Sequence, residues 1–561
     1  MTDTLKGLNQ AQREAVLTTD RHLLVVAGPG TGKTLTIVRR IAHLIGRGIA
    51  PTDILAVTFT NRAAREMRER VSALLGNDAR GVFIGTFHLL GLRILRDSGM
   101  EFSICSREDQ TQVLQSVMGC TAKVAKDMAE SISRVKNLVE TASGETVGVM
   151  DAYQEALKKG GMCDFDDLIG LPADLIGEGR AAYGFSHIIV DEYQDISPGQ
   201  YRLLRCLAAD RARVCAVGDS DQAIYGFRGA DLRNFLDFRR DFPDAAVVVL
   251  KENYRSTQMI VDAASGVIRN NRQRIEKELT AVGAIGRPVT LISVEDERTE
   301  AEFVVREIEA RMGGTSHFRI SGLADPVDFS ESTYAFSDFA VLFRTNGQAK
   351  ALRDTFSAWG IPCQVVGEKA PLRRKALIDD LKAQLSTFTP DLDVEGIIRR
   401  INPESDPSTA EHALLANLAA AYGGLPAKEA LACIIDELSM LGTADAFDPR
   451  ADAVALMTMH MAKGLEFRVV FMAGAEVGIV PFALGREDAD IEEERRLFYV
   501  AMTRAKEELF VVHARKRFLY GRRLPGSPTP FLSEVPRELV RTSALPDNPK
   551  KKEGKQMGLF G

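Results

Sequence analysis

Short runs of apolar residues alternate with amphipathic segments along the first part of the chain. The run HLLVVA ends at Ala27, and ILAVTF (54–59) and GVFIGTF (81–87) follow it. Each run has the length and composition of a buried strand, whereas segments 35–44 and 61–75 repeat apolar residues at helical spacing. Strand-like runs return at 187–192, 214–219 and 245–250. The alternation predicts a parallel β-sheet covered by helices.

A second α/β region follows the first along the chain, and a helical segment interrupts each of the two. Residues 92–180 are helical in pattern, which predicts a helical insertion. The second region has strand-like runs at 338–346, 454–460, 468–475 and 508–514, a polar loop at 313–337, and a turn cluster, INPESDPS. We therefore expect a first α/β domain at 1–91 and 181–286 with the insertion 92–180, a second at 287–376 and 451–543 with a reduced helical insertion at 377–450, and a disordered tail at 544–561.

The segment AGPGTGKT lies between the first predicted strand and the first predicted helix. Its glycines let the chain turn tightly and direct backbone N–H groups inward, at the positive end of the following helix. Lys33 is expected to reach the β- and γ-phosphates of a nucleotide, and the Thr34 hydroxyl to hold Mg²⁺. The alternative is a glycine-rich turn without a ligand. The candidate phosphate-binding residues are Ala27, Gly28, Pro29, Gly30, Thr31, Gly32, Lys33 and Thr34.

The segment VDEYQD (190–195) supplies carboxylates at the end of a predicted strand. Asp191 is expected to hold Mg²⁺ through water, and Glu192 to orient and deprotonate the attacking water. The simpler interpretation is an acidic pair that caps a strand. Phosphoryl transfer also needs positive charge at the γ-phosphate. Arg255 in ENYRST and Arg504 in YVAMTRAKEEL are candidates, although most arginines are merely solvated.

Composition places few further limits on function. The 561 residues allow roughly three or four domains of about 150 residues each. No apolar run is long enough to span a bilayer and MTDTLKGLNQ lacks a signal-peptide pattern, so we expect no membrane association. Seven scattered cysteines without a CxxC pair favour a reducing, cytoplasmic location over a zinc or iron–sulfur protein. The net charge of −6 does not exclude nucleic acid, because binding depends on a local basic groove.

Nine motifs in order extend the phosphate loop and the acidic pair into a longer pattern. They are LNQAQREAV (8–16), AGPGTGKT, TFTNRAAREMRERV, GTFH, VDEYQD, VGDSDQAIYGFRGA (217–230), ENYRST, TMHMAKGLEF (458–467) and EERRLFYVAMTRAKEEL (493–509). With these motifs the chain resembles superfamily 1 DNA helicases of the UvrD, Rep and PcrA type. The resemblance spans residues 8–509, with only the insertions and the tail outside it.

The resemblance implies an α/β fold of two RecA-like motor domains, each with a mainly helical insertion, that bind ATP and Mg²⁺ in the cleft between them. Gln12 would contact the adenine edge and Tyr254 its face, Glu466 would contact the ribose, and Gln222 would sense the γ-phosphate. Single-stranded DNA and its junctions with duplex would be the partners. The residues implied to contact DNA are Phe59, Thr60, His88, Tyr225, Phe227, Arg228 and His460. Rings among basic groups suit stacking on unpaired bases, although any one ring alone is as often part of a core.

The implied activity is that of an ATP-dependent helicase or translocase moving 3′ to 5′ on single-stranded DNA, in DNA repair or replication. Two alternatives stay open. One is a DNA-stimulated ATPase that displaces proteins with little unwinding, and the other is a nucleotide-switched binding protein that controls a partner.

The sequence departs from the family in three places. The residue after GKT is Leu35, where the family usually has an arginine that stacks on adenine, so nucleotide choice is expected to be looser unless Arg39 compensates. Phe227 replaces a tryptophan and offers a smaller face. The second insertion is much shorter than in the larger members, where it contacts duplex DNA, and strand separation is therefore less certain than movement.

The chain ends in KKKEGKQMGLFG, a basic segment followed by a short apolar peptide. QMGLF (556–560) resembles the peptide by which bacterial replication and repair proteins dock on the sliding clamp. Gln556 would enter a polar notch, and Leu559 and Phe560 an apolar pocket. The alternative is a solubilising tail that ends in two apolar residues.

Overall fold

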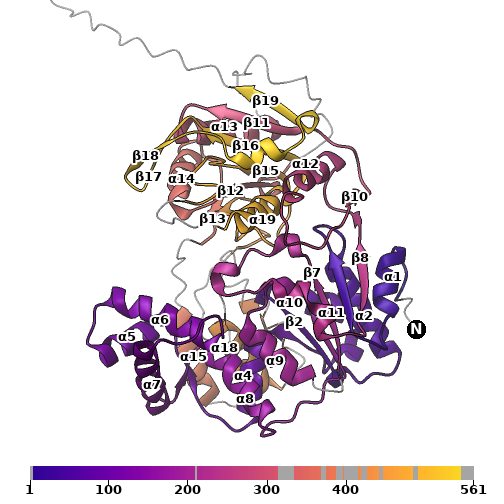
Figure 1. Ribbon diagram of the computed structural model, residues 1–561, viewed down its shortest axis with the longest axis vertical. Coiled ribbons are helices and arrows are strands. Elements are labelled where there is room, and N and C mark those ends of the chain that lie inside the picture. Colours follow the sequence, from indigo (N-terminus) through magenta and orange to yellow (C-terminus); the bar gives the residue numbers. More distant parts are fainter. Residues whose placement is uncertain are drawn as a thin grey trace, which may run out of the picture. The chain divides into compact units, whose positions relative to one another are not determined.

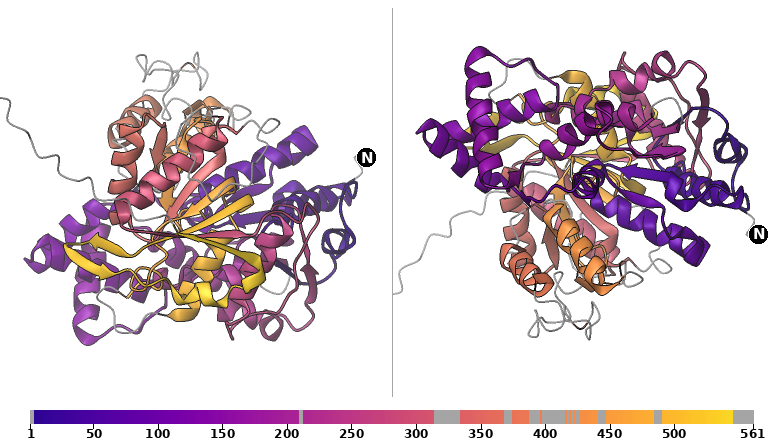
Figure 2. Two further views of the ribbon diagram at one scale, coloured as in Figure 1. Left: turned by 90° about the horizontal axis from the view of Figure 1, so that it is seen from above. Right: turned by 90° about the horizontal axis from the view of Figure 1, so that it is seen from below.

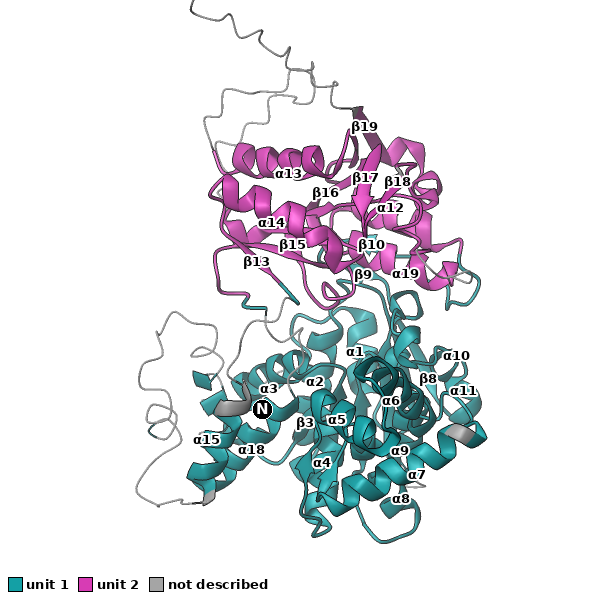
Figure 3. Ribbon diagram, turned by 90° about the vertical axis from the view of Figure 1, so that its left-hand side faces the viewer, with its two compact units in different colours: residues 1–255, 271–283, 366–448 teal, residues 256–270, 284–365, 449–561 magenta. Residues whose placement is uncertain are grey.

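The computed structural model describes residues 4–208, 212–313, 334–367, 374–386, 426–440, 447–483 and 490–544, with a few single residues between 396 and 422. The chain divides into two compact units, which Figure 3 colours separately. Unit 1 comprises residues 1–255, 271–283 and 366–448, and unit 2 comprises residues 256–270, 284–365 and 449–561.

A six-stranded parallel sheet forms the centre of unit 1 (Figure 1). Its strands are β1 (Leu23–Ala27), β2 (Ile54–Thr58), β3 (Phe83–Thr86), β6 (His187–Val190), β7 (Arg213–Gly218) and β8 (Ala246–Leu250). They lie in the order β3, β2, β6, β7, β1, β8. Every pairing is parallel, so the loops that follow all six strands emerge at the same edge.

Helices cover both faces of this sheet (Figure 2). Successive strand residues point to opposite faces, and because both sets are apolar here, each face needs a covering layer. Leu23 and Val25 belong to one core, which is closed by α1 (Gln10–Leu17), α2 (Lys33–Gly46) and α3 (Asn61–Leu75). Leu24 and Val26 belong to the other. That second core is closed by α4 (Phe87–Asp97), α8 (Asp167–Gly177), α9 (Pro198–Ala208), α10 (Arg233–Leu236) and α11 (Phe238–Asp241).

The middle of the predicted insertion 92–180 is mainly helical and has a small core of its own, whereas α8, which also falls in that range, packs on the sheet. It contains α5 (Arg107–Met118), α6 (Ala122–Lys136) and α7 (Gly144–Lys159), with β4 (Ser103–Ile104) paired to β5 (Met162–Cys163). Lys136 at the end of α6 donates to Asp164 at 2.6 Å and to Asp167 at 2.9 Å. The next residue, Asn137, donates to Asp166 at 2.6 Å. These bonds fasten this helical part to the start of α8.

Unit 2 is built on a seven-stranded parallel sheet. Its strands, in spatial order, are β13 (Cys363–Val365), β14 (Val454–Thr458), β12 (Phe339–Phe343), β15 (Phe467–Met472), β16 (Ala505–Ala514), β11 (Val289–Val294) and β19 (Val540–Ala544). On one face α13 (Glu297–Arg311) packs with α14 (Ala349–Ala358), and on the other α12 (Gln258–Ile268) packs with α19 (Ile491–Met502) (Figure 2). A hairpin of β17 (Lys516–Leu519) and β18 (Arg522–Pro525) follows β16.

The described part of the second insertion packs on unit 1. It contains α15 (Arg374–Ser386) and α18 (Ala427–Met440), which pack together and have the colour of unit 1 in Figure 3. Glu437 of α18 accepts hydrogen bonds from Arg65 of α3 at 3.2 Å and from Tyr422 at 2.6 Å. Asn61 donates to the carbonyl of Met440 at 3.0 Å. The insertion is therefore held against the helix that follows β2.

The two parallel sheets confirm the predicted fold class, and the predicted strands occur with small differences at their ends. The strand expected at 81–87 begins at Phe83, because Gly81 adopts a φ of +101° in a turn. The strand expected at 508–514 begins earlier, at Ala505. INPESDPS, most of the expected loop 313–337 and the clamp-like peptide lie outside the described residues. Within the described ranges, no helix has the length and apolar character needed to cross a membrane.

Candidate nucleotide site and nucleic-acid surface

The candidate residues of unit 1 gather at the carboxyl edge of its sheet. AGPGTGKT follows β1, Asp191 follows β6 and Asp219 follows β7. Phe59 follows β2, and His88 lies in the first turn of the helix after β3. In open parallel α/β sheets, ligands bind at this edge, near the point where the strand order reverses. Topology alone therefore brings together residues that are far apart in sequence.

The phosphate loop has the backbone conformation that its glycines allow. Gly30 has a φ of +70° and Gly32 a φ of +81°, values that residues with a side chain rarely adopt. The Thr31 hydroxyl donates to the Gly28 carbonyl at 2.8 Å, which closes the loop on itself. Helix α2 begins at Lys33, so the loop lies at a helix N-terminus, where anions are stabilised.

Lys33 and Glu192 form an ion pair, with Nζ and Oε1 2.9 Å apart. The two side chains are only 14% and 19% exposed. Glu192 has a φ of +51°, which is unusual for a residue with a side chain and marks local strain of the kind found at functional sites. Gln194 donates to the other Glu192 oxygen at 2.5 Å, so both oxygens of the candidate base are engaged.

Asp191 and Thr34 are the candidate magnesium ligands. Asp191 is buried, and its Oδ1 accepts a hydrogen bond from the Glu192 backbone at 3.0 Å. A carboxylate and a hydroxyl are oxygen ligands of the type that Mg²⁺ prefers, and Mg²⁺ keeps several waters when it is bound beside phosphates. The donor set fits the ion. Among the described residues, no group of three or more His, Cys, Asp or Glu forms a further candidate metal site.

The candidate γ-phosphate sensor, Gln222, is buried in the loop after β7. Its Nε2 donates to Asp219 Oδ2 at 2.9 Å, and Asp219 itself is fully buried. The backbone N–H of Asp219 donates to Gln194 at 2.9 Å. Hydrogen bonds therefore connect Gln222 to the residue that holds Glu192.

The adenine side of the site contains one buried candidate, Gln12, one exposed candidate, Tyr254, and the exposed side chain of Leu35. Gln12 is 2% exposed, and its Nε2 donates to the Thr31 carbonyl at 3.0 Å, against the phosphate loop. Tyr254 is 51% exposed and its hydroxyl donates to Glu252 at 2.7 Å. Leu35 is 38% exposed at the start of α2. An exposed ring near the phosphate loop suits stacking on a base.

The segment that carries Arg255 is fastened to the phosphate loop. Asn253 Nδ2 donates to the Pro29 carbonyl at 2.7 Å, and the Tyr254 N–H donates to the Gly30 carbonyl at 2.8 Å. A Cβ at Gly30 would lie 2.6 Å from the Cβ of Arg255, so glycine is required for this close approach. Arg255 therefore begins beside the loop that is expected to hold the phosphates.

Arg504, Glu466 and His460 belong to unit 2. Arg504 is 1% exposed and donates to the carbonyls of Val500 at 2.9 Å and Leu465 at 3.2 Å. Glu466 pairs with Lys506 at 2.6 Å. His460 lies in the turn after β14.

Three aromatic rings and one arginine form a cluster at the carboxyl edge of the unit 1 sheet. Phe59 and Tyr225 stack with their ring centroids 4.6 Å apart, and Tyr225 lies 6.1 Å from Phe227. The Arg228 guanidinium lies over both Tyr225 and Phe227, at 5.4 and 5.5 Å. Tyr225 is buried, whereas Phe227 is 54% exposed. Phe227 and Arg228 therefore face solvent, and the other two rings support them.

Thr60 caps a helix, and His88 packs against an aromatic ring. The Thr60 hydroxyl caps α3 by accepting from the Ala63 N–H at 3.1 Å. His88 packs edge-on against Phe165, with centroids 6.1 Å apart. Burial lowers the pKa of His88 to about 4, so its ring is neutral at physiological pH. A neutral ring can contact a base or a sugar but adds no charge for the phosphates.

The hairpin of β17 and β18 is a candidate surface that the sequence analysis missed. Phe518 is 59% exposed and Tyr520 is 60% exposed, and Lys516, Arg522 and Arg523 flank them. The segment KRFLYGRR mixes aromatic and basic residues, which is the available sequence signal. It begins at Lys516, after the last motif has ended at Leu509, and it matches none of the nine motifs.

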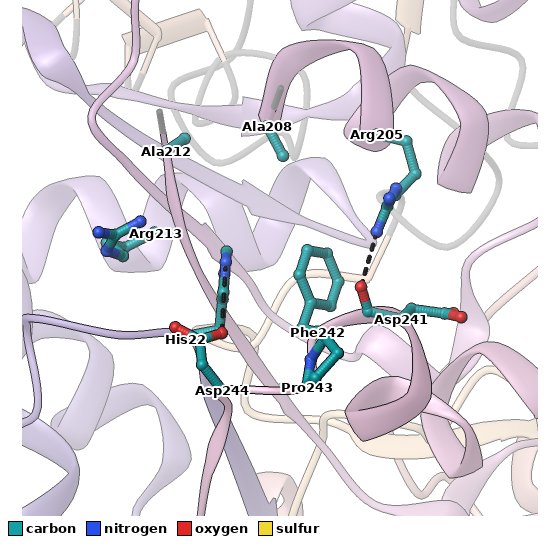
Figure 4. Close-up of a pocket in the computed structure, with 9 residues that line it drawn as sticks. All are labelled: His22, Arg205, Ala208, Ala212, Arg213, Asp241, Phe242, Pro243 and Asp244. Carbon is teal, nitrogen blue, oxygen red and sulfur yellow. Dashed lines mark hydrogen bonds and ion pairs between the residues drawn. The ribbon is translucent and has the colours of Figure 1, made fainter. Parts of the chain in front are cut away.

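A separate cavity of about 290 Å³ lies at the opposite edge of the unit 1 sheet (Figure 4). His22 immediately precedes β1 and Arg213 begins β7, which places the cavity at the amino ends of the strands. Its polar side chains already have partners, as when Arg205 donates to the Asp241 carbonyl at 3.1 Å and Arg213 to the Asp20 carbonyl at 3.0 Å. This cavity lies on the far side of the sheet from the phosphate loop.

Comparisons with known proteins agree with this arrangement. Residues 8–243 match the UvrD/REP helicase N-terminal domain, and residues 248–402 and 413–516 match the UvrD-like helicase C-terminal domain. The chain is 33% identical over 661 residues to the ATP-dependent DNA helicase PcrA of Leuconostoc citreum, covering 96% of this chain and 86% of the relative. It is 32% identical over 658 residues to PcrA of Staphylococcus aureus strain Mu50, covering 96% and 88%. The chain therefore belongs to the UvrD/Rep family of helicases.

Proposed function

We propose that this ATP-dependent DNA helicase moves 3′ to 5′ along single-stranded DNA and serves DNA repair or replication. One observation carries the proposal: the phosphate loop and the Phe59–Tyr225–Phe227 cluster both lie in loops at the carboxyl edge of the same sheet. The candidate nucleotide site therefore shares this sheet edge with a surface suited to unpaired bases. The direction rests on the resemblance of TFTN and GFRGA to the 3′ to 5′ branch of the family.

The Lys33–Glu192 ion pair suggests how hydrolysis begins. When phosphates enter the loop, Lys33 turns toward them and Glu192 loses its cationic partner. Glu192 is then available to orient and deprotonate the attacking water. Asp191 and Thr34 would hold Mg²⁺, which supplies charge to the β- and γ-phosphates. Arg255 and Arg504 would add positive charge to the γ-phosphate, on the strength of their motifs.

We propose the same roles for the remaining candidates as the motifs imply. Gln12 and Tyr254 would bind the adenine, Glu466 the ribose, and Gln222 would report the γ-phosphate. Phe227 and Arg228 would contact the strand directly, with support from Phe59 and Tyr225 and further contacts at Thr60, His88 and His460. The exposed rings of Phe518 and Tyr520 would add a stacking surface from unit 2.

One experiment separates the helicase from its two rivals. ATP hydrolysis and strand separation are measured on 3′-tailed, 5′-tailed and blunt duplexes. Unwinding of the 3′-tailed duplex alone is expected. DNA-stimulated hydrolysis without unwinding on any duplex would favour a translocase that displaces proteins, and hydrolysis indifferent to DNA would favour the nucleotide-switched binding protein. Lys33→Ala is the control, and it should abolish hydrolysis while leaving DNA binding largely intact.

We also propose that Gln556, Leu559 and Phe560 dock on a sliding clamp. Deletion of residues 556–560 should abolish clamp binding while leaving ATP hydrolysis unchanged. Unchanged clamp binding would contradict the proposal.

A further inference from the structure

Residues 271–283, named the strap here, follow α12 and form part of unit 1 beside the candidate nucleotide site. Within the strap, β10 (Thr280–Ala281) pairs in parallel with β9 (Glu252–Asn253), two residues before Arg255. Leu279 lies against the phosphate loop, because a Cβ at Gly28 would come within 2.7 Å of its Cδ2. The strap therefore contacts both the phosphate loop and the segment that leads to Arg255.

Lys277 is a charged residue of the strap whose side chain is buried. Its side chain is 1% exposed, and Nζ donates to Asp219 Oδ1 and to Asp221 Oδ2, each at 2.5 Å. Arg274 of the strap donates to both oxygens of Asp221, at 2.9 and 2.8 Å. Two cations thus balance two buried carboxylates directly after β7.

Asp219 passes this restraint to the residues expected to act on the γ-phosphate. Its second oxygen, Oδ2, accepts from Gln222 at 2.9 Å, and its backbone N–H donates to Gln194 at 2.9 Å. Gln194 in turn donates to Glu192 at 2.5 Å. A continuous set of hydrogen bonds therefore runs from Lys277 to the candidate sensor and to the candidate base.

A purely structural ion pair does not need this arrangement. Buried ion pairs are often no more stabilising than apolar residues of the same shape, because both charges must be desolvated. Lys277 is nevertheless placed so that its single ammonium group fixes the carboxylate that orients the Gln222 amide. A misplacement of about 1 Å in such a group can cost about a hundredfold in rate.

We propose that Lys277 is a positioning residue for ATP hydrolysis, which holds Asp219 and thereby sets the orientation of Gln222 and Glu192. The inference rests on the roles proposed above for those two residues. The hydrogen bonds of Lys277 go to Asp219 and Asp221, and neither of these residues belongs to the phosphate loop. Loss of Lys277 should therefore slow hydrolysis without weakening nucleotide binding.

The test uses the full chain with two variants and a matched control. Lys277→Met removes the ammonium group and leaves one carboxylate unbalanced. In the double variant Lys277→Met/Asp221→Asn, one cation, Arg274, and one carboxylate, Asp219, remain, so the numbers of charges are equal again. The hydrogen bond from residue 277 to Asp219 is still missing. Glu278→Gln is the control, because Glu278 is an exposed residue of the same strap. For each, kcat and KM for ATP are measured with and without single-stranded DNA, together with the affinity for ADP.

We expect kcat to fall at least about tenfold in both Lys277 variants, while the affinity for ADP stays within about twofold of the wild type. The control should behave as the wild type. A wild-type kcat in the double variant would overturn the proposal, since Lys277 would then only neutralise charge. A double variant that does not fold, or that loses ADP affinity together with kcat, would assign Lys277 a structural role and also overturn it.

The failure of this inference is distinguishable from failure of the proposed function. A wild-type chain whose hydrolysis is indifferent to single-stranded DNA contradicts the helicase mechanism. The basal kcat of the variants still tests Lys277 in that case, because the hydrogen bonds lead to the hydrolysis site and not to the DNA surface.

Discussion

The Nζ atom of Lys33 lies 2.9 Å from Oε1 of Glu192, so the lysine of the phosphate loop and the candidate general base are paired with each other. Each group is thereby kept from its expected task, binding phosphate in one case and accepting a proton in the other. Under the roles proposed for these residues, ATP would separate them before hydrolysis begins. Those proposed roles would link nucleotide binding to activation of the base through one ion pair.

Replacement of Glu192 by glutamine is expected to separate binding from hydrolysis. Hydrolysis should fall by about 10²-fold or more, because the amide cannot accept the proton of the attacking water. ATP affinity should rise by about two- to tenfold, because phosphate no longer has to displace a carboxylate from Lys33. A fluorescent ATP analogue measures binding and phosphate release measures hydrolysis. Weaker ATP binding by Glu192→Gln would contradict the link.

Phe227→Ala is expected to weaken binding of single-stranded DNA by about 1–3 kcal/mol, roughly 5- to 150-fold, since base stacking on one ring is lost. Phe227 is 54% exposed, so the fold should tolerate the change. Leu17→Ala, which truncates another exposed apolar side chain of unit 1, is the control. Fluorescence anisotropy with a labelled oligonucleotide measures the affinity. Equal affinities for Phe227→Ala and the wild type would remove Phe227 from the DNA surface.

Leu35→Arg is expected to sharpen the preference for ATP over GTP. Leu35 is 38% exposed at the start of α2, and a guanidinium there can stack on adenine. Such a contact contributes about 0.5–1 kcal/mol, which lowers KM for ATP about two- to fivefold. Leu35→Ala separates this gain from the mere removal of leucine and should leave KM unchanged or higher. If the ratio of the KM values for ATP and GTP is the same in Leu35→Arg as in the wild type, the introduced arginine does not stack on the base.

Asp166→Asn is expected to change the pH dependence of stability. Burial, and secondarily the charge of Asp164, raises the pKa of Asp166 to about 6 in the folded protein, from about 3.9 in an unfolded chain. The folded state then holds the proton more tightly, so this group lowers stability as pH rises from about 4 to about 6, by about 3 kcal/mol in total. The asparagine variant does not titrate, so its stability does not fall in this way, and its side-chain oxygen can still accept the hydrogen bond from Asn137.

The thermal midpoint of Asp166→Asn should therefore rise relative to the wild type between pH 4.5 and pH 7.5, by a few degrees. Asp174→Asn, which removes an exposed carboxylate from α8, the helix that begins directly after Asp166, should show no such trend. A constant difference between Asp166→Asn and the wild type across this range would show that Asp166 is ionised throughout.

The sequence predicted the parts of the fold that depend on local pattern. The strand before AGPGTGKT, the helix at 61–75 and the strand before Asp191 are contiguous in sequence, and their periodicity is sufficient to identify them. Parallel pairing then places their ends at one edge. The two-sheet fold follows from the same reasoning.

Contacts between distant segments could not be predicted in this way. Glu437 meets Arg65, more than 370 residues earlier, because an insertion that belongs to the second domain in sequence packs on a helix of unit 1. Lys277 lies in an unremarkable segment, EKELTAV, and nothing in its neighbourhood indicates two buried aspartates. Such side-chain partners are set by tertiary packing rather than by the local pattern.

The most direct measurement is the steady-state rate of ATP hydrolysis by the full chain as single-stranded DNA is added. If ATP hydrolysis is coupled to DNA binding at the Phe227 surface, the rate of hydrolysis should rise steeply with DNA concentration and then saturate. Lys33→Ala should show no hydrolysis at any DNA concentration. A rate that does not respond to DNA, or one that survives in Lys33→Ala, would contradict the account.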